Sequence, residues 1–443
     1  MIDTFANIFR VPELRKRVSF TLMVLAVYCL CSLVTLPGVN QARLPQLTAG
    51  GGALGNFFGM ASMLSGGQFT KCTIIALGIM PYISASIIFQ LLSSTIPALE
   101  RLAKEGESGR RKINEYTRYA TVPLCLVQAT MYLKFMMNPG AGILANTAGN
   151  WVMGLVCLTG GTIFLMWLGE QVDEFGIGNG ASILITAGIL RRAPAAWMYL
   201  IENFDARLTS SSDGIGITKM LMLLGGFIVV VGGVILIYQG QRRIPIQQAK
   251  HMRGRRVYGG QRHYLPLRVN QAGVMPVIFA SALLIFPAWF FGWLAGNFPG
   301  NGALAFLKNM FQSGSFFYTL LYVVMIFFFA FFWVAIQFNP KEMSNNLRDY
   351  GSFIPGHRPG RRTADYLERV MVRVTLAGAA FLALIAVLPQ IIAQSFGIPW
   401  FVASFFGGTG LLIVVSVMLD VVQKIESHLL MRHYEGFMRS GRK

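Results

Sequence analysis

The residues of this chain that could transfer protons or bind ions lie almost entirely outside its apolar segments. All five histidines fall in polar stretches outside those segments, and Glu170 and Asp420 lie only near segment ends. A proton- or sodium-coupled transporter normally carries acidic residues or histidines inside the membrane, so their scarcity argues against one. The chain has no GxxxxGK[ST] loop, and glycine-rich residues 176–180 are more typical of a helix start than of a nucleotide cradle. We therefore expect no catalytic residue, metal or cofactor.

A nine-residue phrase occurs twice. Residues 78–86 read GIMPYISAS, and residues 273–281 read GVMPVIFAS. Both copies lie in long apolar stretches, and each places a proline at the fourth position. The alternative is a chance similarity between two proline-containing membrane helices. The repeat favours two related halves with a kinkable helix at the same place in each half.

The composition is that of a single integral membrane domain. Hydrophobic residues make up 54% of the 443 residues and charged residues 13%, and the mean hydropathy is +0.54. A soluble chain of this length needs far more charge to cover its surface. The five cysteines include no CxxC pair, so we expect buried free thiols. The first apolar run has no small-residue cleavage site after it and is expected to be an uncleaved span.

Crossing a bilayer takes about 20 apolar residues in a helix. The fifth candidate is weak, because Arg191, Arg192 and Pro194 interrupt it. Such a segment is tolerated only where protein or a cavity surrounds it. The ten expected spans are 18–36, 73–95, 119–137, 151–169, 177–199, 217–238, 271–294, 316–338, 374–393 and 401–422.

The basic residues orient these spans. If both termini are cytoplasmic, thirty of the 38 lysines and arginines fall on the cytoplasmic side. Spans 2 and 7 then carry the repeated phrase in opposite directions. This arrangement is typical of an inverted repeat, with spans 1–5 pairing with spans 6–10 about an axis in the membrane plane. We expect the path for transport at the interface of the two halves.

The segment from Asn56 to Gly66 is apolar but too short to cross, since about ten helical residues reach roughly 15 Å. It is either an interfacial helix or a half-helix that enters and blocks a central cavity. Ile79 and Ile83 lie four residues apart, hence on one face of span 2. Isoleucines placed in this way could close a pore by excluding water, although most isoleucines simply pack against neighbours or lipid.

Two loops, about 239–270 and 339–373, are long and basic. The first carries Arg242, Arg243, Arg262 and Arg268 among others. Such clusters anchor many proteins to anionic lipid. Loops of this length with Pro-Gly and Asn-Pro turns also suit docking to a large acidic or phosphate-rich partner, which would supply any energy that the chain uses.

The sequence closely resembles the SecY family, which forms the channel of the bacterial protein-translocation complex. The likeness extends over essentially all ten spans. Its most specific matches are ALGIMPYISASII at 76–88, EGESGRRK at 105–112, LGEQ at 168–171 with GIGNG at 176–180, and PGHRPG at 355–360.

The resemblance implies an all-α membrane fold of ten transmembrane helices, in two inverted five-helix halves (1–200 and 201–443) around an hourglass pore. It assigns four sets of residues by motif matching. The pore ring is Ile79, Ile83, Ile185, Ile278 and Ile413. The plug half-helix, at about 56–66, includes Asn56, Phe57, Phe58, Met60, Met63 and Leu64. The lateral gate includes Pro81, Ser86, Gln90, Gln128, Asn270 and Pro276, of which Gln90, Gln128 and Asn270 could equally be hydrogen-bonding glue between helices. The docking residues are Arg242, Arg243, Lys250, Arg255, Arg256, Arg358, Arg361 and Arg362.

The resemblance also implies partners and a location. The expected partners are SecE and SecG subunits, the SecA motor ATPase, the ribosome, nascent chains and anionic lipid, at the bacterial cytoplasmic membrane. Ala181 departs from the family pattern, because relatives often have a bulky ring residue there. Two other functions remain open from the residues alone: a secondary transporter of a small solute, which shares the inverted repeat, and a non-transporting scaffold for ribosomes.

Overall fold

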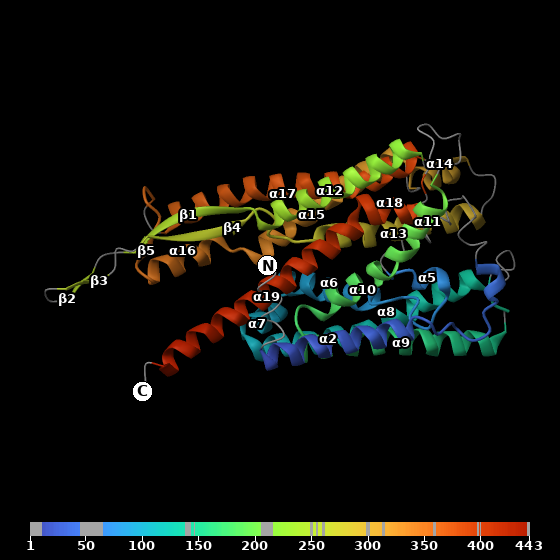
Figure 1. The fold of residues 1–443 in the computed structure, drawn as a ribbon, viewed down its shortest axis with the longest axis horizontal. Coiled ribbons are helices and arrows are strands. Elements are labelled where there is room, and N and C mark those ends of the chain that lie inside the picture. Colours follow the sequence, from blue (N-terminus) through green and yellow to red (C-terminus); the bar gives the residue numbers. More distant parts are fainter. Residues whose placement is uncertain are drawn as a thin grey trace. The chain divides into compact units, whose positions relative to one another are not determined.

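The computed structural model is mostly helical (Figure 1). It describes residues 11–44, 65–137, 143–145, 147–204, 216–248, 251–253, 256–258, 262–297, 302–311, 315–357, 360–396, 398 and 400–440. The chain divides into two compact units. Unit 1 contains residues 1–215, 400–405 and 413–443, and unit 2 contains residues 216–399 and 406–412.

Unit 1 is helical. Helix α9 contacts α2, α6, α8 and α10, and it is therefore the centre of the unit. A buried apolar cluster that includes Cys72, Cys125, Leu133 and Leu158 lies between the helices. The elements are α2 (Pro12–Cys31), the 3-10 turn η1 (Gln41–Arg43), α5 (Gln68–Lys71), α6 (Met80–Thr95), α7 (Pro97–Lys104), α8 (Glu107–Met136), α9 (Ala148–Phe175), α10 (Gly180–Arg191) and α11 (Ala193–Glu202).

Unit 2 is built around α15, which contacts α13 on one side and α17 on the other. Phe279 of α13 packs edge-on against Phe329 and Trp333 of α15, with ring centroids 5.7 and 5.4 Å away. Its helices are α12 (Ile217–Gln239), α13 (Met275–Asn297), α14 (Gly302–Met310), α15 (Phe316–Gln337), α16 (Pro340–Asp349) and α17 (Arg361–Phe396). Helices α18 (Trp400–Gly407) and α19 (Thr409–Ser440) are shared between the two units.

The repeated phrase folds in the same way in both units. Gly78 has φ +60°, and Gly273 has φ +63°. Two residues later a helix begins, α6 at Met80 and α13 at Met275, so that the proline is the second helical residue in each copy. The expectation of a kink at this proline is wrong. A proline at a helix start loses no hydrogen bond, because the first N–H groups have no partner within the helix.

The first long loop is a β-ribbon. Strands β1 (Gln241–Gln248) and β4 (Arg262–Arg268) pair antiparallel, and β5 (Ser352–Phe353) pairs with the other edge of β1. Strands β2 (His251–Arg253) and β3 (Arg256–Tyr258) form a second, two-stranded sheet. Alternation explains the ribbon: Ile244 and Ile246 are buried, while Arg243 and Pro245 are exposed. The two long basic loops therefore share one sheet.

Helices extend further into the expected loops than hydropathy indicates. Helix α8 begins at Glu107, twelve residues before the predicted span, and α17 begins at Arg361 although a loop was expected up to 373. Helix formation continues past the apolar stretch because nothing in these sequences breaks it, and polar helical residues are well solvated outside a membrane.

Four of the described helical segments are individually long and apolar enough to cross a membrane: Ala148–Phe175, Ile217–Gln239, Phe316–Asp349 and Arg361–Ala393. Helices α6 and α7 together make a fifth candidate, bent by 104°. Large apolar side chains on these helices are exposed, among them Val156, Ile228 and Phe328. This is the surface of a multi-pass membrane protein, whose lipid face is as apolar as its core.

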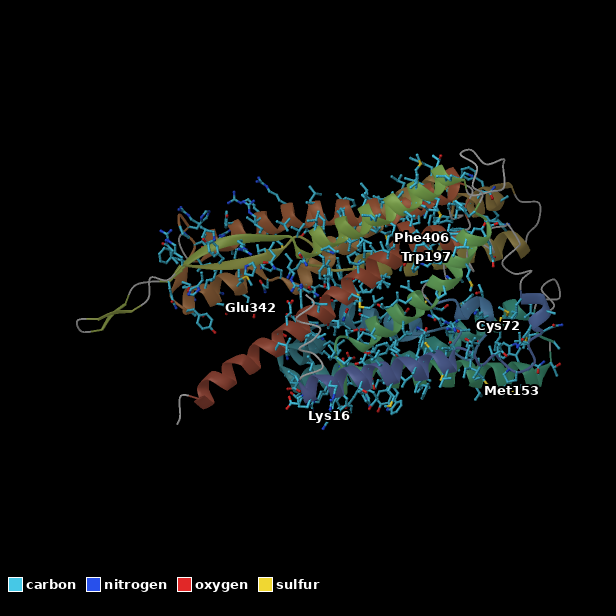
Figure 2. All side chains as sticks on the ribbon, viewed as in Figure 1. Lys16, Cys72, Met153, Trp197, Glu342 and Phe406 are labelled. Carbon is cyan, nitrogen blue, oxygen red and sulfur yellow. The ribbon has the colours of Figure 1, made fainter. Side chains whose placement is uncertain are left out.

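The weak fifth span is broken where the sequence predicts. Helix α10 ends at Arg191, and α11 begins at Ala193 with Pro194 in its first turn. The glycine-rich stretch before α10 is a helix start, since the Asn179 side chain accepts a hydrogen bond from the backbone N–H of Ser182 at 3.0 Å. Cys72 and Cys125 are buried free thiols as predicted, whereas Cys29 is exposed (Figure 2 labels Cys72).

The left-handed glycines generate a stability prediction. Gly273→Ala should lower the free energy of unfolding by about 1–2 kcal/mol, the cost of a left-handed conformation for an L-residue. Gly78→Ala should lower it further, because a Cβ there would lie 3.3 Å from Cα of Ser65. The measurement is the thermal midpoint of helical circular dichroism in detergent.

Gly225→Ala and Gly226→Ala in α12 are the matched controls, since an added Cβ at either position meets no atom of the described part of the chain within 4 Å. Both should leave the midpoint unchanged or raise it. Equal effects for Gly273→Ala and the α12 controls would show that the positive φ is not required.

Candidate channel and docking site

Ile79 and Ile83 lie at the start of α6. The backbone N–H of Ile83 donates to the carbonyl of Ile79 at 3.1 Å, so the two side chains lie one helical turn apart. Ile79 is 4% exposed, and its Cδ1 lies over Gly169 of α9, where an added Cβ would be only 3.6 Å away. Ile83 is half-buried. Ile79 is therefore the anchored member of the pair and Ile83 the more accessible one.

The other three isoleucines of the predicted ring are buried. Ile185 lies in α10, Ile278 in α13 and Ile413 in α19. Serines follow two of them by three positions, and the hydroxyls of Ser281 and Ser416 donate to the carbonyls of Ile278 and Ile413 at 2.8 and 3.1 Å. Unit 1 contains four of the five isoleucines and unit 2 contains Ile278. A closed ring of all five stays a prediction.

The predicted gate residues occupy matching positions in the two repeat copies. Pro81 and Pro276 are buried at the starts of α6 and α13. The polar members are all half-buried: Ser86 and Gln90 on α6, Gln128 on α8, and Asn270 just before the turn at Gly273. Helices α6 and α8 are in contact within unit 1. The gate between the units stays a prediction.

The predicted plug lies mostly outside the described residues, which resume at Ser65. From there the chain is held tightly against α10. Gly66 and Gly67 both have positive φ, +65° and +86°, and a Cβ on Gly66 would lie 2.4 Å from Cα of Gly188. Gly66 and Gly67 therefore form a turn that is seated on Gly188, one helical turn from Ile185.

A buried polar cluster next to this turn was not predicted. Gln68 is fully buried, and its amide donates to the Thr73 hydroxyl at 3.1 Å and to the Ser32 carbonyl at 3.2 Å. The Arg191 guanidinium donates to the Gln68 amide oxygen at 2.9 Å and to the Ser32 hydroxyl. Arginine within an apolar segment was the one sequence signal for this cluster. Burial, with the nearby Arg191 and Arg192 charges, lowers the pKa of Lys71 at the end of α5.

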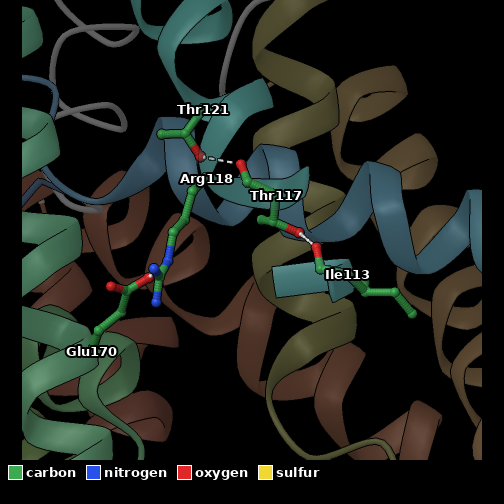
Figure 3. A network of polar contacts seen from close by, with 5 residues as sticks. All are labelled: Ile113, Thr117, Arg118, Thr121 and Glu170. Atoms are coloured by element: carbon green, nitrogen blue, oxygen red, sulfur yellow. Dashed lines mark hydrogen bonds and ion pairs between the residues drawn. The ribbon is translucent and has the colours of Figure 1, made fainter. Parts of the chain in front are cut away.

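The Glu170 carboxylate of the LGEQ motif accepts a hydrogen bond from the Arg118 guanidinium, which joins α9 to α8 (Figure 3). On the α8 side, the hydroxyls of Thr117 and Thr121 donate to the carbonyls of Ile113 and Thr117 at 2.9 and 2.7 Å. Glu170 thus forms an ion pair with Arg118, and it lies near the end of α9, as the sequence predicts. The pair joins one end of α9 to α8.

The predicted docking residues are partly described. Arg242 and Arg243 lie exposed on β1, and Arg361 and Arg362 are exposed at the start of α17. The backbone of Arg256 lies in β3. The remaining three, Lys250, Arg255 and Arg358, lie outside the described residues.

The sheet separates its basic residues by face. Arg243 pairs with Pro266, so it points to the same side as Arg262, Tyr264 and Arg268 of β4. Ile244, Ile246 and Arg242 point to the opposite side, where the isoleucines are buried. The first side is exposed and carries three arginines and one aromatic ring. This basic face suits a large anionic partner.

Together the fold and site define a multi-pass, mostly helical membrane protein with a duplicated glycine–proline helix start. Two solved structures share this fold. The structure of a protein conducting channel matches with a TM-score of 0.66 and 20% identity over 93% of this chain and 92% of that chain. Sec61 in the canine ribosome-channel complex matches with a TM-score of 0.61 and 18% identity, over 93% and 92% of the two chains.

The chain belongs to the SecY family. The family model described as SecY matches residues 73–422. A protein from Thermotoga maritima named Protein translocase subunit SecY is 39% identical over 456 residues, covering 100% of this chain and 99% of that protein. A protein of the same name from Streptomyces coelicolor is 42% identical over 449 residues, covering 99% and 100%.

Proposed function

We propose that this chain is the channel-forming subunit of a bacterial protein translocase. It passes unfolded polypeptides across the cytoplasmic membrane and releases hydrophobic segments sideways into lipid. The observation that carries the proposal is the match to SecY translocase subunits over the whole chain at about 40% identity. The identical glycine–proline helix start in both units supports a duplicated architecture.

In this proposal ten spans form two inverted halves, and Ile79, Ile83, Ile185, Ile278 and Ile413 form a waist between them. Aliphatic side chains keep a narrow pore dry and impermeable to ions, yet they deform around a passing chain. Residues 56–66 act as a plug, and the buried turn at Gly66 and Gly67 fixes the end of the plug against α10. Signal segments of 7–15 apolar residues leave through the seam next to α6 and α13.

The chain itself catalyses nothing in this proposal, and partners supply the energy. A ribosome or the SecA motor docks on the basic sheet face and on the loop at about 339–373, which includes Arg358. SecE and SecG complete the complex. Both termini face the cytoplasm. This orientation is supported because it puts thirty of the 38 lysines and arginines on the cytoplasmic side, where basic residues are enriched in membrane proteins.

The waist generates the test of this function. Ile83→Asn and Ile278→Asn should each raise ion leak through the resting channel and the export of a reporter with a defective signal, by about tenfold or more. An amide wets the constriction, and a loss of about 1.4 kcal/mol from the closed state changes the open-to-closed ratio tenfold. The measurements are ion flux in proteoliposomes and reporter secretion in cells.

Ile88→Asn is the matched control, because Ile88 lies on the same helix and its side chain is 42% exposed. It should leave both leak and export at the level of the unaltered protein. The proposal fails if Ile83→Asn and Ile278→Asn behave like Ile88→Asn.

The sheet faces generate a second prediction. Arg243→Glu should weaken binding of purified ribosomes or SecA about tenfold, since it reverses a charge beside Arg262 and Arg268. Arg242→Glu changes the same charge on the opposite side of the strand and should weaken binding much less. Cosedimentation of the detergent-solubilised protein measures both. Equal losses for the two variants would mean that net charge, and not this face, attracts the partner.

A further inference from the structure

The turn at residues 65–67 lies between α10 and the start of α6. On one side, a Cβ added at Gly188 of α10 would lie 3.0 Å from Cα of Gly66, so the two backbones are in contact. On the other side, a Cβ added at Gly78 would lie 3.3 Å from Cα of Ser65. All of these residues belong to unit 1. Residues 65–67 therefore form a spacer between the two helices.

This spacer lies next to three of the isoleucines proposed to form the waist. Gly78 directly precedes Ile79, and α6 places Ile83 one helical turn further along. Gly188 follows Ile185 by three residues on α10. The spacer therefore helps to set the distance of Ile79 and Ile83 from Ile185.

Short-range hydrogen bonds hold the shape of the spacer. The backbone N–H of Phe69 donates to the Ser65 hydroxyl at 3.1 Å, and the Thr70 hydroxyl donates to the Gly67 carbonyl at 3.1 Å. The Tyr132 hydroxyl of α8 donates to the Phe69 carbonyl at 2.7 Å. These three bonds shape the turn, but they do not join it to α10.

The hydrogen bonds to α10 come from the Arg191 guanidinium at the end of that helix. It donates to the amide oxygen of the fully buried Gln68 at 2.9 Å, one residue after the spacer, and to the hydroxyl of Ser32 at the end of α2. The Gln68 amide in turn donates to the Thr73 hydroxyl and to the Ser32 carbonyl. One guanidinium thus joins α10, the end of α2 and the stretch that begins α5, because its planar fork reaches two acceptors at once.

The Arg191–Gln68 hydrogen bond fixes geometry more than it adds stability. A cation within an apolar segment costs free energy, and a buried polar network is often no more stable than apolar residues of the same size. A hydrogen bond nevertheless tolerates little change in distance or angle, whereas an apolar contact can slide. Packing alone would leave the spacer free to shift along α10 at Gly188. The Arg191–Gln68 bond removes that freedom.

We propose that Arg191 and Gln68 are positioning residues of the channel waist. By holding the spacer at a fixed height on α10, they set the distance of Ile79 and Ile83 from Ile185 in the resting channel. In this role neither residue touches a passing polypeptide. The inference rests on the proposed function, because that function requires a waist that closes.

The first test measures ion leak in proteoliposomes and the export of a reporter with a defective signal. Arg191→Met and Gln68→Leu should each raise both by about fivefold to tenfold, since a spacer that shifts lets water pass the isoleucines. Arg191→Lys should leak as well, because a flexible ammonium does not hold Gln68 and Ser32 in the geometry of the guanidinium fork. Leak at the level of the unaltered protein in Arg191→Met overturns the proposal.

Leu158→Ala is the matched control for lost stability. Leu158 is fully buried in the apolar cluster of unit 1, it belongs neither to the spacer nor to the Gln68 cluster, and its truncation leaves a cavity. The thermal midpoint should fall in Leu158→Ala at least as far as in Arg191→Met, yet the ion leak should stay unchanged. Equal leak in Leu158→Ala and Arg191→Met would show that general loss of stability opens the channel, which overturns the proposal.

The double variant Gln68→Leu with Arg191→Met separates positioning from stability. It removes both members of a buried pair and leaves fewer unpaired polar groups than either single variant, so its thermal midpoint should recover toward that of the unaltered protein. Its leak should stay raised, because apolar side chains do not fix the spacer on α10. Recovery of the seal together with the midpoint would reduce the cluster to a contribution to stability and contradict a positioning role.

The last test measures the spacing without using channel activity. Spin labels in place of the exposed Ile88 on α6 and Leu190 on α10 report the distance between the two helices by pulsed dipolar spectroscopy in detergent. Arg191→Met should shift or broaden this distance by about 2 Å, whereas Leu158→Ala should leave it unchanged. An unchanged distance in Arg191→Met overturns the proposal even where leak is raised.

Failure of this inference and failure of the proposed function give different results. Leak in Ile83→Asn, with neither leak nor a changed distance in Arg191→Met, overturns the inference and leaves the channel function standing. A changed distance in Arg191→Met without leak in Ile83→Asn contradicts the proposed function instead, while the role of Arg191 in spacing the helices stands.

Discussion

Both halves of the repeat depend on one backbone conformation. Gly78 and Gly273 each adopt a left-handed φ that costs an L-residue about 1–2 kcal/mol. A helix begins two residues after each glycine, at Met-Pro. The proline is the second helical residue, where its missing N–H breaks no hydrogen bond within the helix. The start of the helix then fixes where Ile83 and Ile278 lie, because each follows its proline by two residues. A geometry required at one glycine thus sets the depth of the residues proposed to close the channel.

The two copies of this turn have different surroundings. Gly78 lies against Ser65, in the chain that leads from the predicted plug, whereas no atom of the described residues lies within 4 Å of a Cβ added at Gly273. The turn at Gly66 and Gly67 and the polar cluster around Gln68 hold the same stretch against α10. The N-terminal copy therefore joins a helix start to an attachment point, and the C-terminal copy is free of that role. The two copies thus share the turn but differ in what surrounds it. This difference fits a plug that is present only beside the N-terminal copy.

Much of the fold follows from hydropathy. A segment that crosses a bilayer must satisfy its backbone hydrogen bonds internally, and it therefore folds as a helix. Helices α6 and α13 overlap the expected spans 73–95 and 271–294, and the break at Arg192 was anticipated from Arg191, Arg192 and Pro194. The conformation of the repeat was not, because a proline after Gly-x-Met reads equally as a kink or as a first turn. The pairing of β1 with β5 brings residues 247–248 to 352–353, and no local pattern encodes a contact over that distance. The Gln68 cluster was missed for the same reason: its members come from three separate segments, at Ser32, at Gln68 and Thr73, and at Arg191.

The most direct measurement of the central claim is disulfide crosslinking of a stalled secretory chain that carries a single cysteine. Cysteines replace Ile83 in one variant of the channel and Ile278 in another, with Ile88→Cys as the exposed reference. The account predicts that the same cysteine of the stalled chain crosslinks to both positions 83 and 278 and not to position 88. Crosslinks to neither position, or equally to position 88, would contradict a polypeptide path lined by these two isoleucines.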